Sequence, residues 1–217
     1  MRGLILKDFY NLKKYGKQIT IILGVFLIFG IMMKSSLYIC FMIMLYGTMT
    51  IITAMSYDEK AGFDKFALSM PIKREDLVKS KYAVWLIIMF SALLVSFVTG
   101  LVINLFVGGN YIEMIISMLA VESVYIILFS IVIPIFFKFG VEKGRMYMMA
   151  VFIIPSILGA VAAGVINKAG ISINENQINQ IIENDMYLII AGAVIFVILA
   201  VYVSFRVSVR IILKKEF

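Results

Sequence analysis

Histidine is absent from this 217-residue chain, and cysteine and proline are scarce, with one and three copies respectively. Without histidine the chain lacks the commonest metal ligand and the usual proton carrier near neutral pH. The single cysteine, Cys40, lies within an apolar stretch, so no disulfide can form inside the chain. A phosphate-binding loop of the Gly-x-x-x-x-Gly-Lys-Ser/Thr type is also missing. These absences predict a chain that is not an enzyme, with no catalytic residue, no metal site and no bound cofactor.

Charged residues are few as well, at 15% of the chain, whereas hydrophobic residues make up 63% and the mean hydropathy is +1.04. A soluble domain of this length could not cover so much apolar surface with so little polar surface. The composition therefore predicts an integral membrane protein.

Six apolar windows are long enough, or nearly so, for helices that cross a bilayer, which takes roughly 20 residues each. The windows are Ile19–Met33, Leu37–Met55, Ala83–Val107, Met114–Phe137, Met146–Ile166 and Met186–Phe205. Barrel strands are excluded, because they need only about 10 residues each and alternate apolar with polar positions. The predicted fold class is all-α: a single transmembrane domain with six transmembrane helices. Its parts are an interfacial helix (1–17), helices one and two (19–55), a polar stretch (56–82), helices three to five (83–166), an external segment (167–185) and helix six with the tail (186–217).

The positive charge is distributed unevenly between the two sides of this plan. With the N-terminus inside, 18 of the 20 lysines and arginines lie on the inner side, and only Lys34 and Lys168 lie outside. Cytoplasmic segments carry such an excess of positive charge in membrane proteins. We therefore expect a multi-pass protein of the cell membrane with both termini in the cytoplasm. The net charge of +7 is explained by this orientation and needs no nucleic-acid partner.

The polar stretch from Ser56 to Tyr82 lies on the cytoplasmic side and mixes acids with bases. Phe63, Phe66 and Met70 recur at the spacing of one helical face, which predicts a short amphipathic helix over Glu59–Ser69. Pro71 ends this helix, because it lacks a backbone N–H and disfavours helical geometry in the residue before it. A second helix is expected to begin near Lys73 and to run into the third apolar window.

The same stretch resembles a known family. The resemblance rests on Asp58-Glu59, on Gly62-Phe63-Asp64-Lys65-Phe66-Ala67-Leu68-Ser69, on Met70-Pro71-Ile72-Lys73-Arg74 and on Val78-x-x-Lys81-Tyr82. These residues are similar to the cytoplasmic motif of permease subunits of type-2 ATP-binding-cassette exporters, including the small six-helix permeases that export phenol-soluble modulins. In that family an aromatic-rich helix precedes a proline turn, and the next helix opens with a Lys-Tyr pair.

The resemblance implies a half-transporter, in which two permeases, identical or sister subunits, dock two cytoplasmic ATPase subunits that hold ATP and magnesium. The helix over Glu59–Ser69 would be the coupling helix, with Phe63 and Phe66 anchored in a groove of the ATPase. The competing interpretation is that both phenylalanines pack on the chain's own membrane face. The residues assigned to coupling are Asp58, Glu59, Phe63, Asp64, Lys65, Phe66, Ser69, Pro71, Arg74 and Lys81. The expected cargo is amphipathic or hydrophobic: a peptide, a toxin or a drug.

Three further interpretations stay open in the sequence. Glu122 lies inside the fourth apolar window, where a carboxylate is costly unless it is functional or partnered, and with Asn104 it forms a candidate substrate pathway. A stand-alone secondary carrier that uses Glu122 is therefore one alternative function, and a scaffold or immunity subunit that moves nothing is another. The segment 1–17 is either an amphipathic helix whose basic face lies on anionic lipid or a purely topogenic end. The external segment is either an amphipathic helix or a polar loop.

Overall fold

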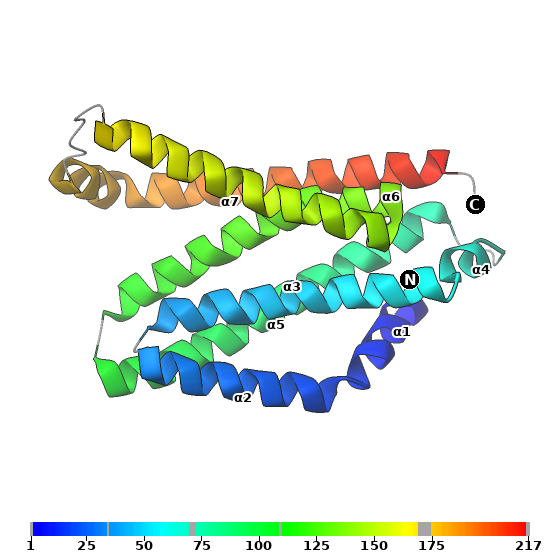
Figure 1. The fold of residues 1–217 in the computed structure, drawn as a ribbon, viewed down its shortest axis with the longest axis horizontal. Coiled ribbons are helices and arrows are strands. Elements are labelled where there is room, and N and C mark those ends of the chain that lie inside the picture. The colour runs from blue at the N-terminus through cyan, green and yellow to red at the C-terminus, as the bar shows by residue number, and fades with distance from the viewer. Residues whose placement is uncertain (1, 34, 70–72, 109, 169–174, 216–217) are drawn as a thin grey trace.

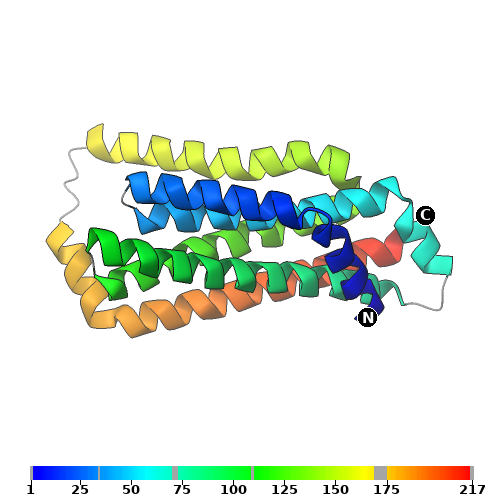
Figure 2. The same ribbon diagram turned by 90° about the horizontal axis from the view of Figure 1, so that it is seen from below.

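The computed structural model describes residues 2–33, 35–69, 73–108, 110–168 and 175–215, and every element in them is a helix. The helices are α1 (Arg2–Lys13), α2 (Gly16–Met33), α3 (Ser36–Lys60), α4 (Phe63–Ser69), α5 (Arg74–Val107), α6 (Tyr111–Lys168) and α7 (Glu175–Lys214). The long helices run side by side as one elongated bundle (Figures 1 and 2). The prediction of an all-α fold is confirmed.

Five of these helices are long and apolar enough to cross a membrane within the described residues. The spans are Gly16–Met33, Leu37–Lys60, Arg74–Leu105, Tyr111–Val161 and Ile190–Lys214. The fourth span contains both the fourth and the fifth predicted windows. Gly140 interrupts it with φ 79° and ψ 171°, and the chain turns back on itself there (Figure 1). The two predicted helices are therefore present, but the polar loop expected between them is reduced to a break at one glycine.

The core of the bundle surrounds α3, which lies against α2, α5 and α6. Ile39, Met44 and Ile51 of α3 are almost fully buried, as are Trp85 of α5 and Phe129 of α6. Because lipid tails are as apolar as these side chains, helix association here depends on close packing rather than on escape from water. The core therefore fixes the relation of α3, α5 and the first half of α6.

By contrast, α2 is loosely packed. Gly30 is its one buried residue in the described part, and a side chain there would collide with Ile39 of α3. The contact at Gly30 lies near the C-terminal end of α2, next to the tight turn in which the Ser35 hydroxyl caps α3. A cleft separates the N-terminal half of α2 from α3 and α5.

The elements predicted to be cytoplasmic gather at one end of the bundle, where α1, α4 and the end of α7 lie together (Figures 1 and 2). Here α1 packs against α5 and α3 and buries Leu4. Its basic face was expected to lie on lipid, but Lys7 instead contacts Asp58 of α3. The prediction of a helix at the N-terminus is confirmed over Arg2–Lys13, and Lys7 lies against an acidic side chain of the protein. At the opposite end, residues 175–185 of the external segment are helical in α7, while 169–174 lie outside the described residues.

Candidate functional site

The polar stretch predicted as one helix over Glu59–Ser69 is divided in the structure. α3 continues past Glu59, and α4 begins only at Phe63. Between them Gly62 has φ +60°, the left-handed conformation with which many helices end, and its N–H donates to the Glu59 carbonyl at 3.1 Å. The predicted helix start at Glu59 is wrong, because the glycine ends α3 first. We call residues 56–82, which comprise the end of α3, α4 and the start of α5, the coupling region.

Four charged side chains of the coupling region and α1 form an ionic cluster where α1, α3 and α5 meet. The Lys81 ammonium donates to both carboxylate oxygens of Asp8, at 2.9 and 2.8 Å, and to Asp58. Lys7 pairs with the same acids, at 2.5 Å to Asp58 and 3.2 Å to Asp8. Asp8, Asp58 and Lys81 are only 1%, 5% and 8% exposed, so two positive and two negative charges balance one another away from water. The cluster holds the three helices in a fixed relation.

Asp58 and Lys81 were both predicted to meet the ATPase, yet the structure directs them into the protein. Lys7 and Asp8 are the members of the cluster that were not predicted from the sequence. A signal was available, because Asp8 is the only acidic residue before Asp58 and lies in an otherwise basic segment. A lone carboxylate among lysines on an amphipathic helix indicates a specific ion pair rather than a lipid-facing side chain.

Glu59 connects the coupling region to the break in α6. Its carboxylate accepts a hydrogen bond of 2.5 Å from the N–H of Val141, the residue after the break. A carboxylate in this place satisfies a free amide at the start of the returning half of α6 and suits the positive end of that helix. A Cβ at Gly140 would lie 2.3 Å from Glu59 Oε1, so this approach requires glycine. Glu59, predicted at the rim of a docking surface, thus serves as a cap within the chain.

Arg74 connects the coupling region to the end of α7. Its guanidinium Nη1 donates to the carbonyls of Ile212, Leu213 and Lys215, at 3.3, 3.0 and 3.2 Å. Ile212 and Leu213 belong to the last turn of α7 and Lys215 follows it; backbone acceptors there lack partners within the helix, and the helix dipole favours a cation. Arg74 therefore caps α7 from the first residue of α5.

Tyr82, next to Lys81, contacts a different set of helices. Its hydroxyl is hydrogen-bonded to Ser204, at 2.5 Å, and to Ser208, at 2.9 Å, both on α7. Ser204 in turn donates to the carbonyl of Ser130 on α6. The two residues of the Lys-Tyr pair thus contact different helices: the lysine contacts α1 and α3, and the tyrosine contacts α7 and, through Ser204, is linked to α6.

The two phenylalanines of α4 differ in exposure. Phe63 is partly buried against a small apolar cluster that includes Leu4 and Leu77, and the Lys7 ammonium lies 3.5 Å from the centre of its ring. Phe66 is 56% exposed. Phe63 therefore packs on the chain itself, as one interpretation of the sequence expects. Phe66 projects from α4, as the other interpretation requires.

The remaining predicted coupling residues are partly described. Ser69 is exposed, and its hydroxyl donates to the Phe66 carbonyl at 2.7 Å, which closes the last turn of α4. Asp64 and Lys65 lie in α4, but their side chains fall outside the described part of the chain, and Pro71 lies outside the described residues altogether.

The junction between α1 and α2 is attached to the end of α3 through two tyrosines. The rings of Tyr15 and Tyr57 are stacked, with centroids 5.9 Å apart and planes inclined by 25°. Their hydroxyls are hydrogen-bonded, and this bond raises the pKa of Tyr15 above its ordinary value of 10, because it favours the protonated phenol. The position at which the chain turns into α2 is thereby fixed beside the coupling region.

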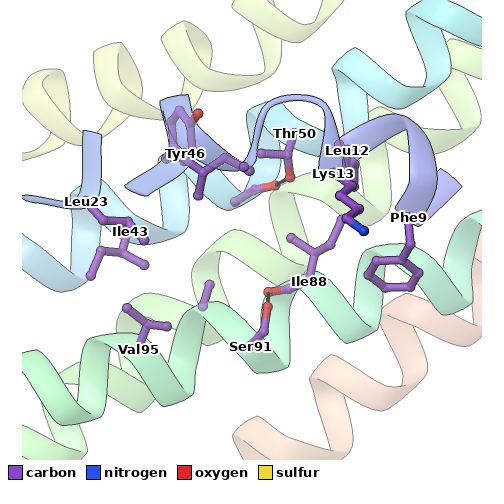
Figure 3. A pocket seen from close by; sticks show the side chains of 14 residues that line it. Phe9, Leu12, Lys13, Leu23, Ile43, Tyr46, Thr50, Ile88, Ser91 and Val95 are labelled. Carbon is purple, nitrogen blue, oxygen red and sulfur yellow. Dashed lines mark hydrogen bonds between the residues drawn. The ribbon is translucent and has the colours of Figure 1, made fainter. Parts of the chain in front are cut away.

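A cleft of about 410 Å³ lies between this junction, α2, α3 and α5 (Figure 3). Its walls are almost entirely apolar, and no acidic residue is among those that line it within the described chain. Lys13, the last residue of α1, lies at the end of the cleft that is predicted to be cytoplasmic. The lining residues are Phe9, Leu12, Lys13, Gly16, Ile19, Leu23, Ile43, Tyr46, Gly47, Thr50, Ile88, Ser91, Ala92 and Val95.

Glu122 and Asn104, the predicted substrate pathway, are half-buried on α6 and α5. Asn104 lies within the last turn of α5, whereas Glu122 is 11 residues into α6, about 16 Å from its start at 1.5 Å per residue. The two side chains therefore lie at different depths. Neither residue lines the cleft between α2 and α5.

Comparison with known proteins gives one match. A family model described as ABC-2 family transporter protein matches residues 3–212, almost the whole chain. No curated protein and no solved structure matches the chain.

Proposed function

Because the chain belongs to the ABC-2 transporter family and forms its membrane component, we propose that it is the permease subunit of an ATP-driven exporter. In this proposal ATP and magnesium are bound by a separate cytoplasmic ATPase subunit that docks on α4. A second permease, identical or a sister subunit, completes the transporter. The cargo is an amphipathic or hydrophobic molecule that moves out of the cell.

The observation that carries the proposal is the contrast between the outer and inner sides of the coupling region. On its outer side α4 presents Phe66, an exposed aromatic side chain of the kind that anchors protein interfaces. On its inner side the region is bound to every neighbouring element: α1 through Lys81, the returning half of α6 through Glu59, and α7 through Arg74. The exposed side chain of Phe66 can bind a partner. The internal contacts can then transmit the movement of that partner to the membrane helices.

The mechanism follows from the stiffness of these attachments. α3 and α5 enter the coupling region directly, so a force on α4 acts on both helices at once. The ionic cluster extends the force to α1, and the caps at Val141 and at the end of α7 extend it to the remaining spans. Packed and hydrogen-bonded elements of this kind move as rigid bodies, so the closing of two ATPase subunits would tilt the helices together.

The proposal is tested with Phe66→Ala in the permease co-expressed and purified with candidate ATPase subunits from its source. Removal of an interface anchor typically costs about 2 kcal/mol, or roughly 30-fold in affinity. We expect the ATPase to be lost from the purified complex and ATP hydrolysis in proteoliposomes to fall by about tenfold or more. Phe90→Ala is the matched control, because Phe90 is 61% exposed on the membrane-spanning part of α5.

An unchanged complex with Phe66→Ala would refute docking on this helix. A permease that never retains any ATPase, yet binds cargo, would instead support the scaffold or immunity function. Transport by the purified permease alone under an ion gradient, abolished by Glu122→Gln, would support the secondary carrier.

A further inference from the structure

The cleft of Figure 3 has the shape and the chemistry of a site for one apolar chain. Its lining extends from Gly16 to Leu23 on α2 and from Ile88 to Val95 on α5, each about 10 Å at 1.5 Å per residue. The cleft therefore runs along the helices, parallel to the lipid tails. Both walls belong to membrane spans, so its occupant is hydrocarbon rather than water.

The few polar groups in the wall offer little to a polar ligand. The hydroxyl of Thr50 donates to the carbonyl of Gly47 at 2.7 Å, and that of Ser91 donates to the carbonyl of Ile88 at 2.8 Å (Figure 3). The hydrogens of these two hydroxyls are thus used within their own helices, and the third hydroxyl among the lining side chains is that of Tyr46. A ligand bound along this wall is held by apolar contact.

The volume of the cleft suits a small ligand. Its 410 Å³ lies within the range of roughly 300–1,000 Å³ typical of small-molecule sites. The length of the lining along the helices suits a single alkyl chain.

Lys13 indicates which charge the head group of the ligand should carry. It lies at the cytoplasmic mouth, and Figure 3 shows its amine directed toward the space between Phe9 and Ile88. Lys7 and Lys81 are engaged in the ionic cluster, but Lys13 forms no ion pair within the described part of the chain. An unpaired ammonium above an apolar cleft that has no acidic lining complements an anionic head group.

We propose that this cleft is the inner-leaflet binding site of the cargo, and that the cargo is an amphiphile with one unbranched apolar chain and an anionic head group, such as a long-chain carboxylate. This inference rests on the proposed function. Binding of a ligand in this cleft can also be transmitted to the ionic cluster through α1. This helix contributes Phe9, Leu12 and Lys13 to the cleft and, one turn away, Asp8 to the ionic cluster. A ligand that moves α1 therefore acts on Lys81 and on the base of the coupling region.

The test uses the full chain, without ATPase, in phosphatidylcholine nanodiscs. The probe is palmitic acid with a photoreactive diazirine in mid-chain, and the comparison probe is the corresponding alcohol. We expect saturable labelling by the acid at α2 and α5 residues of the cleft. Lys13→Glu should weaken this binding about tenfold, and Lys14→Glu, the same change one residue further on an exposed side chain outside the cleft, less than twofold.

A second pair of variants tests the apolar wall. Val95→Trp should block labelling, because Val95 lines the deep end of the cleft, whereas Leu94→Trp should not, because Leu94 is 50% exposed and does not line it. Equal labelling of wild type and Lys13→Glu, equal labelling by acid and alcohol, or labelling spread over the lipid-facing surface would overturn the proposal. Displacement of the probe by phosphatidylglycerol would also overturn it, because the site would then hold resident lipid.

An activity measurement separates this inference from the proposed function. In the complex with its ATPase, palmitate should stimulate ATP hydrolysis by the wild type and by Lys14→Glu but not by Lys13→Glu. If the complex forms and palmitate stimulates none of the proteins, the cleft is not a cargo site although the transporter assignment stands. If no ATPase binds, the proposed function fails while the binding measurement in nanodiscs is unaffected.

Discussion

Among the residues of the coupling region, we expect Lys81 to contribute most to the free energy of unfolding. It is 8% exposed and binds two carboxylates, Asp8 and Asp58, that are buried more deeply than it is. Truncation of a buried ion pair leaves an uncompensated charge, which costs far more than the pair contributes while it is intact. The stability of the cytoplasmic end therefore depends on the balance of this cluster.

Lys81→Met tests this balance. It leaves two buried carboxylates with Lys7 as their only cation, so we expect the free energy of unfolding to fall by about 3 kcal/mol. Lys79→Met is the matched control, because Lys79 pairs with Glu75 at 3.7 Å with both side chains more than 40% exposed, and such pairs contribute about 0.5 kcal/mol or less. Thermal unfolding in detergent measures both variants. A Tm for Lys81→Met that equals that of Lys79→Met would show that the cluster contributes nothing.

Among the elements, α6 is the one whose form depends most on a single contact. It continues as a helix on both sides of Gly140, and the reversal between the halves is held by Glu59 at the Val141 N–H. A residue with a side chain at φ 79° is strained, by roughly 1–3 kcal/mol.

Gly140→Ala should therefore destabilise the protein by about 2 kcal/mol or more, because the new methyl group would meet both this strain and the Glu59 carboxylate. Gly159→Ala is the control in the same helix: nothing lies within 4 Å of its Cβ position, and alanine is the better helix former by up to about 1 kcal/mol. Unfolding in detergent should lower the Tm for the first variant and raise or preserve it for the second. Equal Tm values would mean that the break does not need glycine.

The elements could be predicted because they depend on neighbouring residues, whereas the contacts of the coupling region could not. A run of apolar residues such as Leu37–Met55 predicts a spanning helix by itself, and Pro71 by itself predicts that the helix before it ends. The partners of Lys81, by contrast, are 73 and 23 residues away, and the partner of Glu59 is 82 residues away. Spacing along the chain contains no information on such pairs. Phe63 and Phe66 share a helical face in sequence, yet only the fold decides that one meets α1 and α5 and the other is exposed.

For the whole molecule, the gathering of α1, α4 and the end of α7 at one pole agrees with the charge distribution of the sequence (Figure 1). The bundle is therefore polarised: one end carries the coupling region and most of the lysines and arginines, and the other carries the short α2–α3 and α5–α6 turns. Because positively charged segments remain in the cytoplasm, this end should face the ATPase.

Two single-cysteine variants test this orientation in intact cells. Cys40 is fully buried, so Cys40→Ala provides a background without reactive thiols. Ser69→Cys places a thiol on exposed α4, and Tyr111→Cys places one at the start of α6, where Tyr111 is 45% exposed. A membrane-impermeant maleimide should label position 111 in intact cells and position 69 only after the cells are opened, because about 30 Å of hydrocarbon separates the two ends. The reverse pattern would place α4 outside the cell, where no cytoplasmic ATPase could reach Phe66, and would contradict the assignment of this region to coupling.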